Sequence, residues 1–317
     1  MSALRVLVTG ASGFIGRALT ERLVADGHVV TALGRDAARL PAGAAPLLAA
    51  RLDDDTLAGA LGTQRFDIVY HLAAYGVAPD QRDPDTMFAV NVAGTAAIVR
   101  AARRAGAGAV VYAGSSAEYR EARHGTRIGE DHPLARTGLY GTSKAAGGLW
   151  GGALAAREGV AFQWLRIFGV FGPGEAPHRL LPAIADKLAR GQAVDLSPGD
   201  QIRDFLYVDD AVVGLARAGE AALRGPGGCY NLCSGIPVSV KDVALAMADA
   251  MGRPRDLLRF GALAYRPDEN LWLCGNGDAL REATGCEPSL GLRQAIDRFL
   301  AARAPHSDMS THGENRP

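Results

Sequence analysis

The sequence predicts an α/β protein in which a doubly wound parallel sheet is followed by a smaller C-terminal α/β domain. Two observations lead to this prediction. Continuously apolar runs, typical of strands buried on both faces, alternate with stretches of helical periodicity along the first 172 residues. After residue 172 the pattern changes to shorter segments that Pro and Gly interrupt. Alternating strands and helices indicate a parallel sheet because each helix carries the chain back to the same end of the sheet.

The elements follow in order along the chain. The expected strands are RVLVT (5–9), HVVTAL (28–33), 47–52, IVYHLAA (68–74), AVVYAGSS (109–116) and FQWLRIFGVFG (162–172). The expected helices are FIGRALTERLVADG (14–27), a segment near 86–106 and a segment at 140–158. We assign the main domain to 1–170 plus about 204–235, the second domain to about 171–203 plus 236–303, and a polar, disordered tail to 304–317.

Composition argues against several classes of protein. The 317 residues include 34 basic and 34 acidic side chains, so no net charge attracts nucleic acid or a membrane surface. No stretch approaches the roughly 18 uninterrupted apolar residues of a membrane helix. The first ten residues run straight into a strand, which argues against a signal peptide. Four scattered cysteines fit buried thiols in a reducing compartment better than a metal site. We expect a cytoplasmic protein without a metal.

A glycine-rich loop joins the first strand to the first helix. In TGASGFIG (9–16) the first glycine permits a tight turn, the second lets the backbone approach a pyrophosphate, and the third allows close packing of helix and strand. The helix N-terminus adds free N–H groups and a partial positive charge. Strand, loop, helix and second strand together predict a dinucleotide site. The expected contacts in this loop are Gly10, Ser12, Gly13, Phe14, Ile15 and Gly16.

The end of the second strand bears on which dinucleotide binds. Proteins that bind NAD usually place an Asp or Glu there, whose carboxylate accepts hydrogen bonds from the adenine ribose. Here Gly34 takes that place and Arg35 follows. Without the acid a 2′-phosphate is not repelled, and an arginine can bind it. The alternative is that Arg35 is an exposed loop residue. We therefore favour NADP(H) over NAD(H) as the cofactor.

Three further positions are candidates for cofactor contacts. Asp53 follows the third strand and either accepts from the adenine amino group or belongs to a solvated acidic loop. Small residues in HLAAYG (71–76) leave room for a cofactor, and the expected contacts there are Leu72, Ala73 and Ala74. Asn91 lies in an otherwise apolar helix. Its buried amide needs partners, so a structural role and a ligand role are equally good interpretations.

A tyrosine, a lysine and a pair of serines predict acid–base chemistry. Tyr140 and Lys144 are spaced i and i+4 on one helix face. A phenol with a pKa near ~10 needs its anion stabilised before it can act at neutral pH, and an adjacent ammonium does this. Lys144 can also hold the nicotinamide ribose hydroxyls. Ser115 and Ser116 end a strand upstream and can polarise a carbonyl oxygen.

With these motifs in place, the sequence resembles the extended short-chain dehydrogenase/reductase family of NAD(P)-dependent nucleotide-sugar epimerases, dehydratases and reductases. The motifs that carry the resemblance are TGASGFIG, HLAA, NVAGT, GSSAEY, YGTSK, RDFLYVDD and RPDE. The resemblance implies a Rossmann-type sheet, Tyr140 as the acid/base, Lys144 as its electrostatic partner and one serine. Counting back from Tyr119 favours Ser115, whereas counting from the strand end favours Ser116.

The resemblance also implies a substrate side. Arg203 and Arg266 match positions where family members grip a nucleotide-sugar diphosphate, and two guanidinium groups suit a pyrophosphate. HRLLPAI (178–184), with Arg179, is similar to the family's segment that lines the base and diphosphate, and Tyr75 is a further candidate for substrate contact. The alternative is that Arg203 and Arg266 are surface residues paired with Asp204 or Asp268.

The leading hypothesis is NADPH-dependent reduction of the 4-keto group of a nucleoside-diphosphate 4-keto-6-deoxyhexose. Dehydratases of the family hold Asp and Glu directly after the catalytic Thr, a pattern that this chain lacks because its Glu118 adjoins Tyr119. The first alternative is a nucleotide-sugar 4-epimerase that retains NAD. Reduction of small apolar carbonyls and a non-catalytic, dinucleotide-sensing regulator are further alternatives.

A homodimer is expected from KAAGGLWGGALAA (144–156). Its small residues let a helix approach a symmetry mate closely, or else pack only on the chain's own sheet.

Overall fold

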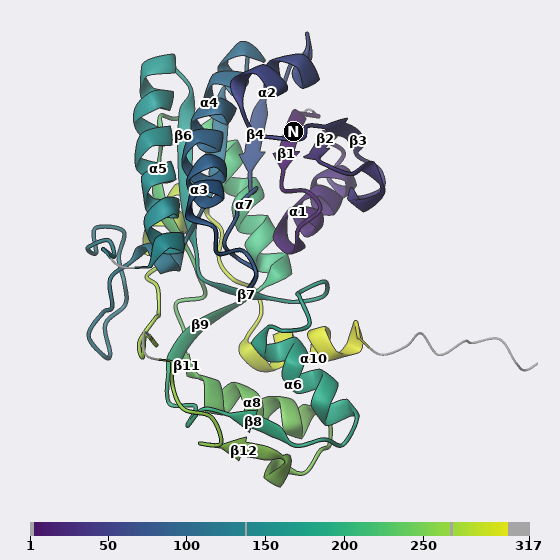
Figure 1. Ribbon diagram of the computed structural model, residues 1–317, viewed down its shortest axis with the longest axis vertical. Coiled ribbons are helices and arrows are strands. Elements are labelled where there is room, and N and C mark those ends of the chain that lie inside the picture. The colour runs from purple at the N-terminus through teal and green to yellow at the C-terminus, as the bar shows by residue number, and fades with distance from the viewer. Residues whose placement is uncertain (1–2, 137, 267–268, 304–317) are drawn as a thin grey trace, which may run out of the picture.

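The computed structural model describes residues 3–136, 138–266 and 269–303. Within these residues a seven-stranded parallel sheet forms the centre of the N-terminal part (Figure 1). Its strands follow the order β10 (Gly227–Leu232), β6 (Ala161–Ile167), β5 (Ala109–Ser115), β4 (Ile68–His71), β1 (Arg5–Thr9), β2 (Val29–Gly34) and β3 (Ala45–Leu48). Because the order reverses at β1, the sheet is doubly wound. The predicted Rossmann-type α/β fold is confirmed.

Helices cover both faces of this sheet, and successive strand residues point into two different cores. Val6 and Val8 of β1 enter the core beneath α1 (Phe14–Ala25) and α7 (Val208–Ala222). Leu7 enters the opposite core, and the helices on that face are α2 (Asp54–Leu61), α4 (Gly94–Arg104) and α5 (Leu139–Glu158). Burial on both faces explains why the strands read as uninterrupted apolar runs.

The C-terminal part packs below the carboxyl ends of the main strands (Figure 1). One small sheet contains β11 (Pro237–Ser239), β9 (Ile202–Tyr207) and β7 (Gly169–Phe171), and a second pairs β12 (Leu258–Phe260) with β8 (Val194–Leu196). Its helices are α6 (Leu180–Ala189), α8 (Val240–Ala250), α9 (Asp278–Thr284) and α10 (Leu292–Ala301). The chain enters this part after β6 and returns to the main sheet through β10.

Three predicted elements differ from the structure. The single strand predicted at 162–172 is interrupted at Phe168, since β6 stays in the main sheet while β7 pairs with β9. The third strand ends at Leu48 rather than at residue 52. The helix predicted near 86–106 consists of α3 (Pro84–Phe88), a π-helical turn η2 (Ala89–Ala93) and α4. The tail at 304–317 lies outside the described residues.

The described residues also contain three 3₁₀ helices of a single turn each. They are η1 (Ala37–Arg39), η3 (Ser116–Glu118) and η4 (Arg255–Leu257). Of these, η3 directly follows β5 and therefore lies at the carboxyl edge of the sheet, where ligands of doubly wound folds bind. In the part of the chain that the structure describes, no helix has the length and apolar character needed to span a bilayer.

The glycines of α5 let this helix pack closely against its own sheet and against η2. A Cβ at Gly148 would stand 2.3 Å from the Trp164 ring, and one at Gly147 would stand 2.2 Å from the Asn91 carbonyl oxygen. These small residues therefore serve packing within the chain, which is the alternative to the predicted contact with a symmetry mate. The outward face carries Leu149 and Trp150 instead, with 58% and 60% of their surface exposed.

Candidate active site

The loop between β1 and α1 forms a cradle whose size glycine sets. Gly10 has φ +68°, and a Cβ there would stand 2.6 Å from the Ala73 nitrogen. A Cβ at Gly16 would stand 2.1 Å from the Gly10 carbonyl oxygen. Gly13 precedes α1, and no side chain caps the helix there. The free N–H groups of this helix end, at an uncovered loop, therefore fit a pyrophosphate.

A buried histidine connects the cradle to the neighbouring strands. Thr9 Oγ1 accepts a hydrogen bond from the Ala73 nitrogen at 3.2 Å and lies 2.7 Å from His71 Nδ1. His71 Nε2 lies 3.2 Å from Thr95 Oγ1. Burial lowers the pKa of His71 to about 3, and the nearby Lys144 adds to the effect, so the imidazole is neutral. Sequence reasoning missed His71, although a polar residue inside an apolar strand was the available signal.

Asn91 holds the segment that follows β4. Its Nδ2 donates to the Tyr75 carbonyl at 2.8 Å and to Ser143 Oγ at 2.9 Å, and its Oδ1 accepts from the Tyr75 nitrogen at 2.9 Å. These bonds occupy both amide protons, which agrees with the structural interpretation of Asn91. The segment that it fixes lies partly exposed beside the glycine loop and contains Leu72, Ala73, Ala74 and Tyr75.

Asp53 caps a helix. Its Oδ1 accepts from the Thr56 nitrogen at 2.8 Å, and its Oδ2 lies 2.9 Å from Arg51 Nε. The hydrogen bonds from Thr56 lower the pKa of Asp53, so the carboxylate is ionised at neutral pH. The local sequence DDD thus begins α2. The Asp53 carboxylate already has two partners within the protein, Thr56 and Arg51.

Arg35 lies exposed immediately after β2. Its guanidinium makes no hydrogen bond or ion pair with any residue that the structure describes. Nearby, Arg17 Nη2 on the second turn of α1 donates to the Arg39 carbonyl at 2.6 Å. This contact brings a second arginine from α1 to the loop that follows β2, and Arg17 also lies 4.0 Å from Glu21 Oε1.

Lys144 is buried on α5, one turn beyond Tyr140. It is 1% exposed, and its Nζ lies 4.2 Å from the centroid of the Tyr112 ring. Burial lowers the pKa of Lys144 to about 8, while the negative charge of Glu118 acts in the opposite direction. The ammonium is therefore the main form at neutral pH.

Tyr140 faces Ser115 across the start of α5. Burial raises the pKa of Tyr140, and a side-chain hydrogen bond with Ser115 opposes this rise. The closeness has a structural cause, since a Cβ at Gly141 would stand 2.0 Å from the Ala117 carbonyl oxygen. The first turn of α5 therefore rests directly on η3. Of the two serines, the structure brings Ser115 to the phenol, whereas Ser116 is buried and makes no such contact.

The predicted substrate arginines lie on the C-terminal side. Arg203 of β9 donates to its neighbouring Ile202 carbonyl at 2.8 Å and forms an ion pair with Glu269. Burial lowers the pKa of Arg203, and the positive charge of the exposed Arg266 adds to this, so the two guanidinium groups lie near each other.

The partner proposed for Arg203 in the alternative interpretation is wrong. Asp204 is buried and accepts instead from the Ser234 hydroxyl at 2.7 Å and from the Gly275 nitrogen at 3.1 Å. Asp268 lies outside the described residues. Sequence reasoning did not identify Glu269 as the residue that pairs with Arg203.

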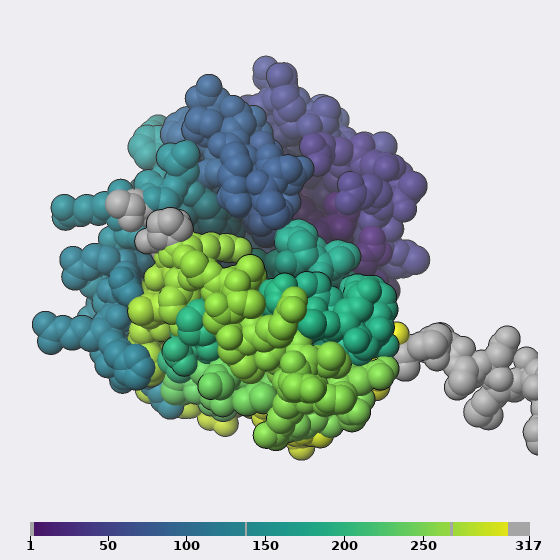
Figure 2. All heavy atoms as spheres, turned by 60° about the horizontal axis from the view of Figure 1, so that its bottom comes forward, coloured from purple at the N-terminus to yellow at the C-terminus, as the bar shows by residue number. Residues whose placement is uncertain are grey.

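Arg179 directly precedes α6, and its charge acts to lower the pKa of Tyr140. Its Nε is 3.4 Å from Glu175 Oε1. Figure 2 shows a furrow where the N-terminal part, in purple and blue, meets the C-terminal segments, in teal and green.

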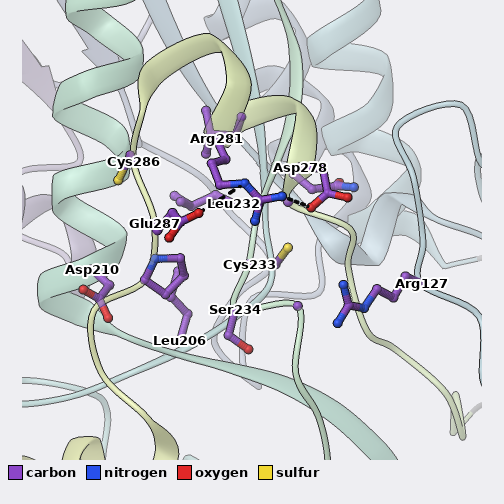
Figure 3. A pocket seen from close by; sticks show the side chains of 15 residues that line it. Arg127, Leu206, Asp210, Leu232, Cys233, Ser234, Asp278, Arg281, Cys286 and Glu287 are labelled. Carbon is purple, nitrogen blue, oxygen red and sulfur yellow. Dashed lines mark hydrogen bonds and ion pairs between the residues drawn. The ribbon is translucent and has the colours of Figure 1, made fainter.

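A separate small cavity lies at the carboxyl end of β10 (Figure 3). Its volume is about 70 Å³, and none of the predicted site residues lines it. Arg281 occupies its wall and is paired with Asp278 at 2.6 Å and with Glu287 at 3.3 Å. These two carboxylates neutralise Arg281, and a second arginine, Arg127, also lines the cavity. No cluster of His, Cys, Asp and Glu suited to a metal ion occurs among the described residues.

Comparison with known proteins agrees with this geometry. The model of the NAD dependent epimerase/dehydratase family matches residues 6–233. The chain belongs to this family. The match includes the glycine cradle, η3 and the Tyr140–Lys144 helix, and it confirms the resemblance to extended short-chain dehydrogenases/reductases.

Several relatives of this family align along nearly the whole chain. A UDP-glucose 4-epimerase of Mycolicibacterium smegmatis is 30% identical over 94% of this chain and 97% of that protein. A dTDP-6-deoxy-L-talose 4-dehydrogenase (NAD(P)(+)) of Kitasatospora kifunensis is 29% identical over 95% and 96%. The structure of a Thermus thermophilus UDP-glucose 4-epimerase in complex with NAD has a TM-score of 0.83 and 27% identity, covering 94% and 98%.

Proposed function

We propose that this family member is an NADPH-dependent reductase of the 4-keto group of a nucleoside-diphosphate 4-keto-6-deoxyhexose. The observation that carries the choice of cofactor is the exposed Arg35 after β2, at the position where an acid would repel a 2′-phosphate. A net reductase must exchange its oxidised cofactor for a reduced one at each turnover. Cells keep NADP mostly reduced, so a contact with the 2′-phosphate of NADPH suits a net reductase. The dehydrogenase relative that acts with NAD(P)(+) supports the reaction class.

The proposed roles follow from the geometry around α5. Tyr140 donates its phenol proton to the developing alkoxide, and Ser115 holds that oxygen by a hydrogen bond. Lys144 keeps the phenol reactive through its charge and holds the ribose hydroxyls of the cofactor. A bound reduced nicotinamide supplies the hydride. The proposed cofactor contacts are those in the glycine loop, at Arg35, Asp53 and Lys144, and in the segment Leu72–Ala74, which the predicted contact Asn91 holds in place through Tyr75 rather than touching the cofactor itself.

The substrate is proposed to lie in the furrow between the two parts of the chain. Arg203 and Arg266 bind its diphosphate, and Arg179 and Tyr75 make further contacts with the substrate. The substrate-binding domain on this proposal comprises about 171–203 plus 236–303. Diphosphate binding at Arg203 requires that its ion pair with Glu269 be exchanged for the new anion.

A paired turnover assay tests the function. The purified protein is offered a nucleoside-diphosphate 4-keto-6-deoxyglucose with NADPH or with NADH, and nicotinamide absorbance is followed. The proposal expects consumption with a clear preference for NADPH. Absence of consumption with either cofactor contradicts it.

A nucleotide-sugar 4-epimerase is the second candidate. The similarity to the Mycolicibacterium smegmatis and Thermus thermophilus epimerases favours it, and the latter holds NAD. An epimerase oxidises and re-reduces the same substrate, so its cofactor remains bound. Stoichiometric NAD released on denaturing the protein, together with no net consumption of NADPH, would favour this candidate over the reductase.

We also propose a homodimer formed through the outward face of α5. Leu149 and Trp150 are large apolar residues on this face, and both are more than half exposed. Sedimentation of the wild type should give twice the chain mass. Trp150→Glu should give a monomer that keeps its helical content, whereas a monomeric wild type contradicts the proposal.

A further inference from the structure

We propose that Glu118 is a positioning residue, whose buried carboxylate fixes the backbone at Ser115 and keeps a negative charge beside Tyr140 and Lys144. The inference deepens the proposed function, because it rests on Tyr140 as the acid/base. The acids of the family's dehydratases directly follow the catalytic hydroxyl, whereas Glu118 stands three residues after Ser115 and reaches back to it.

The first contact fixes the serine. Glu118 Oε1 accepts from the Ser115 nitrogen at 2.8 Å, and Ser115 Oγ accepts from the Ala117 nitrogen at 3.2 Å. This reciprocal pair is a capping box around η3. A Cβ at Gly114 would stand 2.7 Å from Glu118 Oε1, so glycine at this position leaves the carboxylate room to fold back.

The second contact fixes the carboxylate itself. Glu118 is fully buried, and its Oε2 accepts from Arg166 Nε at 3.0 Å. Trp164 Nε1 lies 3.4 Å from the other oxygen. Both partners belong to β6, where Arg166 is the register partner of Gly114 on β5.

Further hydrogen bonds hold the guanidinium in turn. Arg166 Nη1 donates to the Tyr119 hydroxyl at 2.9 Å and to the Glu130 carbonyl at 2.8 Å. The Tyr119 hydroxyl donates to Asn231 Oδ1 at 2.6 Å. An anchored partner of this kind holds the carboxylate more rigidly than a long surface side chain would.

The third link reaches α5. The close contact of Gly141 with the Ala117 carbonyl presses the first turn of α5 onto η3. The titratable and charged groups that act on Glu118 or feel its charge come from four elements: Arg166 on β6, Lys144 and Tyr140 on α5, Tyr112 on β5, and Cys229 on β10. Glu118 therefore influences all three proposed catalytic groups without facing the substrate.

The sign of the electrostatic effect follows from the charges. Burial raises the pKa of the Glu118 carboxyl, while the Ser115 N–H and the charge of Arg166 act against this rise. In its ionised form Glu118 opposes ionisation of the Tyr140 phenol and favours the charged form of Lys144. Removing that charge should lower the pKa of both groups. Tyr140 must be protonated to donate, so the alkaline limb of the pH profile for reduction should move to lower pH.

Glu118→Gln tests the inference. Gln offers one oxygen where Glu118 receives donors on two, so either Ser115 or Arg166 loses its acceptor. We expect the pKa of Tyr140 to fall by about one unit, measured as tyrosinate absorbance against pH after subtraction of a Tyr140→Phe partner variant. We expect kcat to fall about tenfold, with a smaller change in KM.

Asp210→Asn is the matched control. Asp210 is also a buried carboxylate, and it accepts from the Ser289 nitrogen at 3.0 Å and hydroxyl at 2.7 Å near the small cavity (Figure 3). Its loss should leave the pKa of Tyr140 unchanged. An equal shift in Asp210→Asn, or no shift in Glu118→Gln, overturns the inference.

Arg166→Lys provides a second, independent variant. It keeps a positive charge against Glu118 but loses the planar fork, so kcat should fall several-fold while the pKa of Tyr140 moves little. Should Glu118→Gln fail to fold, a wild-type kcat in Arg166→Lys would still overturn the inference. The tyrosinate titration needs no substrate, so its outcome is separate from failure of the proposed reductase activity.

Discussion

Around Tyr140 the charged groups lie inside the protein, whereas around Arg35 they lie in solvent. Lys144 and Glu118 are 1% and 0% exposed, and Glu118 is bonded to the backbone of η3 and to β6. Arg35 follows β2 on the surface and is bonded to no described side chain. Both regions lie at the carboxyl edge of one sheet, but the charges are buried and bonded in the first region, whereas in the second Arg35 is exposed and bonded to no described residue.

The difference reflects two kinds of task. Proton transfer depends on groups held in a fixed geometry at low dielectric, where each charge has a large effect on its neighbours. Recognition of a phosphate needs a cation that water can solvate until the ligand arrives. Substitutions in the buried region should therefore change rate, pKa and stability, while substitutions in the exposed region should change affinity alone.

The largest effect is expected from Tyr140→Phe. Loss of the phenol proton should lower kcat by about 10²- to 10⁴-fold, because proton donation to the alkoxide is removed. Cofactor affinity should stay within about twofold of wild type, since the ring remains in place. Steady-state kinetics and cofactor titration by fluorescence measure the two quantities, and retained turnover would remove Tyr140 from its proposed role.

Substitutions of the two serines should have different effects on kcat in the same assay. Ser115→Ala should lower kcat by about 10²-fold, because it removes a hydrogen bond that the oxyanion needs. Ser116→Ala should change kcat less than about threefold, since Ser116 does not contact Tyr140. Equal losses in both variants would contradict the placement of Ser115.

His71 should make stability depend on pH. Its pKa is about 3 in the folded protein and 6.5 in the reference state, so between these values the unfolded chain binds a proton that the folded chain excludes. The free energy of unfolding should thus fall as pH drops below 6.5, by up to about 1.4 kcal/mol per unit. Urea unfolding from pH 4 to 8 measures the slope. His71→Gln should flatten it, and an unchanged slope would assign the effect to other groups.

Substitution of the exposed Arg35 should have the smallest effect, limited to the KM for NADPH. Arg35→Ala should raise KM for NADPH by about tenfold and leave KM for NADH unaltered, because only the 2′-phosphate contact is lost. Higher ionic strength should weaken NADPH binding in the wild type more than in the variant. A parallel rise in both KM values would mean that Arg35 supports the loop rather than the phosphate.

Local patterns predicted most of the fold and several of the groups at the site. Apolar runs located the strands, and glycine spacing located the cradle, because both follow from short-range geometry. The break at Phe168 was missed because β6 and β7 are equally apolar and only their pairing partners differ. The pairs Glu118–Arg166 and Arg203–Glu269 were missed because each joins segments far apart in sequence, whereas the contact of Glu118 with Ser115 is local and S-x-x-E was an available signal for it. Asn91 remained ambiguous until its three hydrogen bonds were known.

The close fit of α5 on its sheet has a consequence for protein engineering. Replacing helical glycine by alanine is a common way to raise thermal tolerance, worth about 1 kcal/mol at a permissive site. At Gly148 the new methyl group would overlap the Trp164 ring, so that substitution should lower the melting temperature. At Gly152 it would meet only Phe162, at an ordinary 3.5 Å. One helix thus offers both a forbidden and a permitted position for the same design rule, about one turn apart.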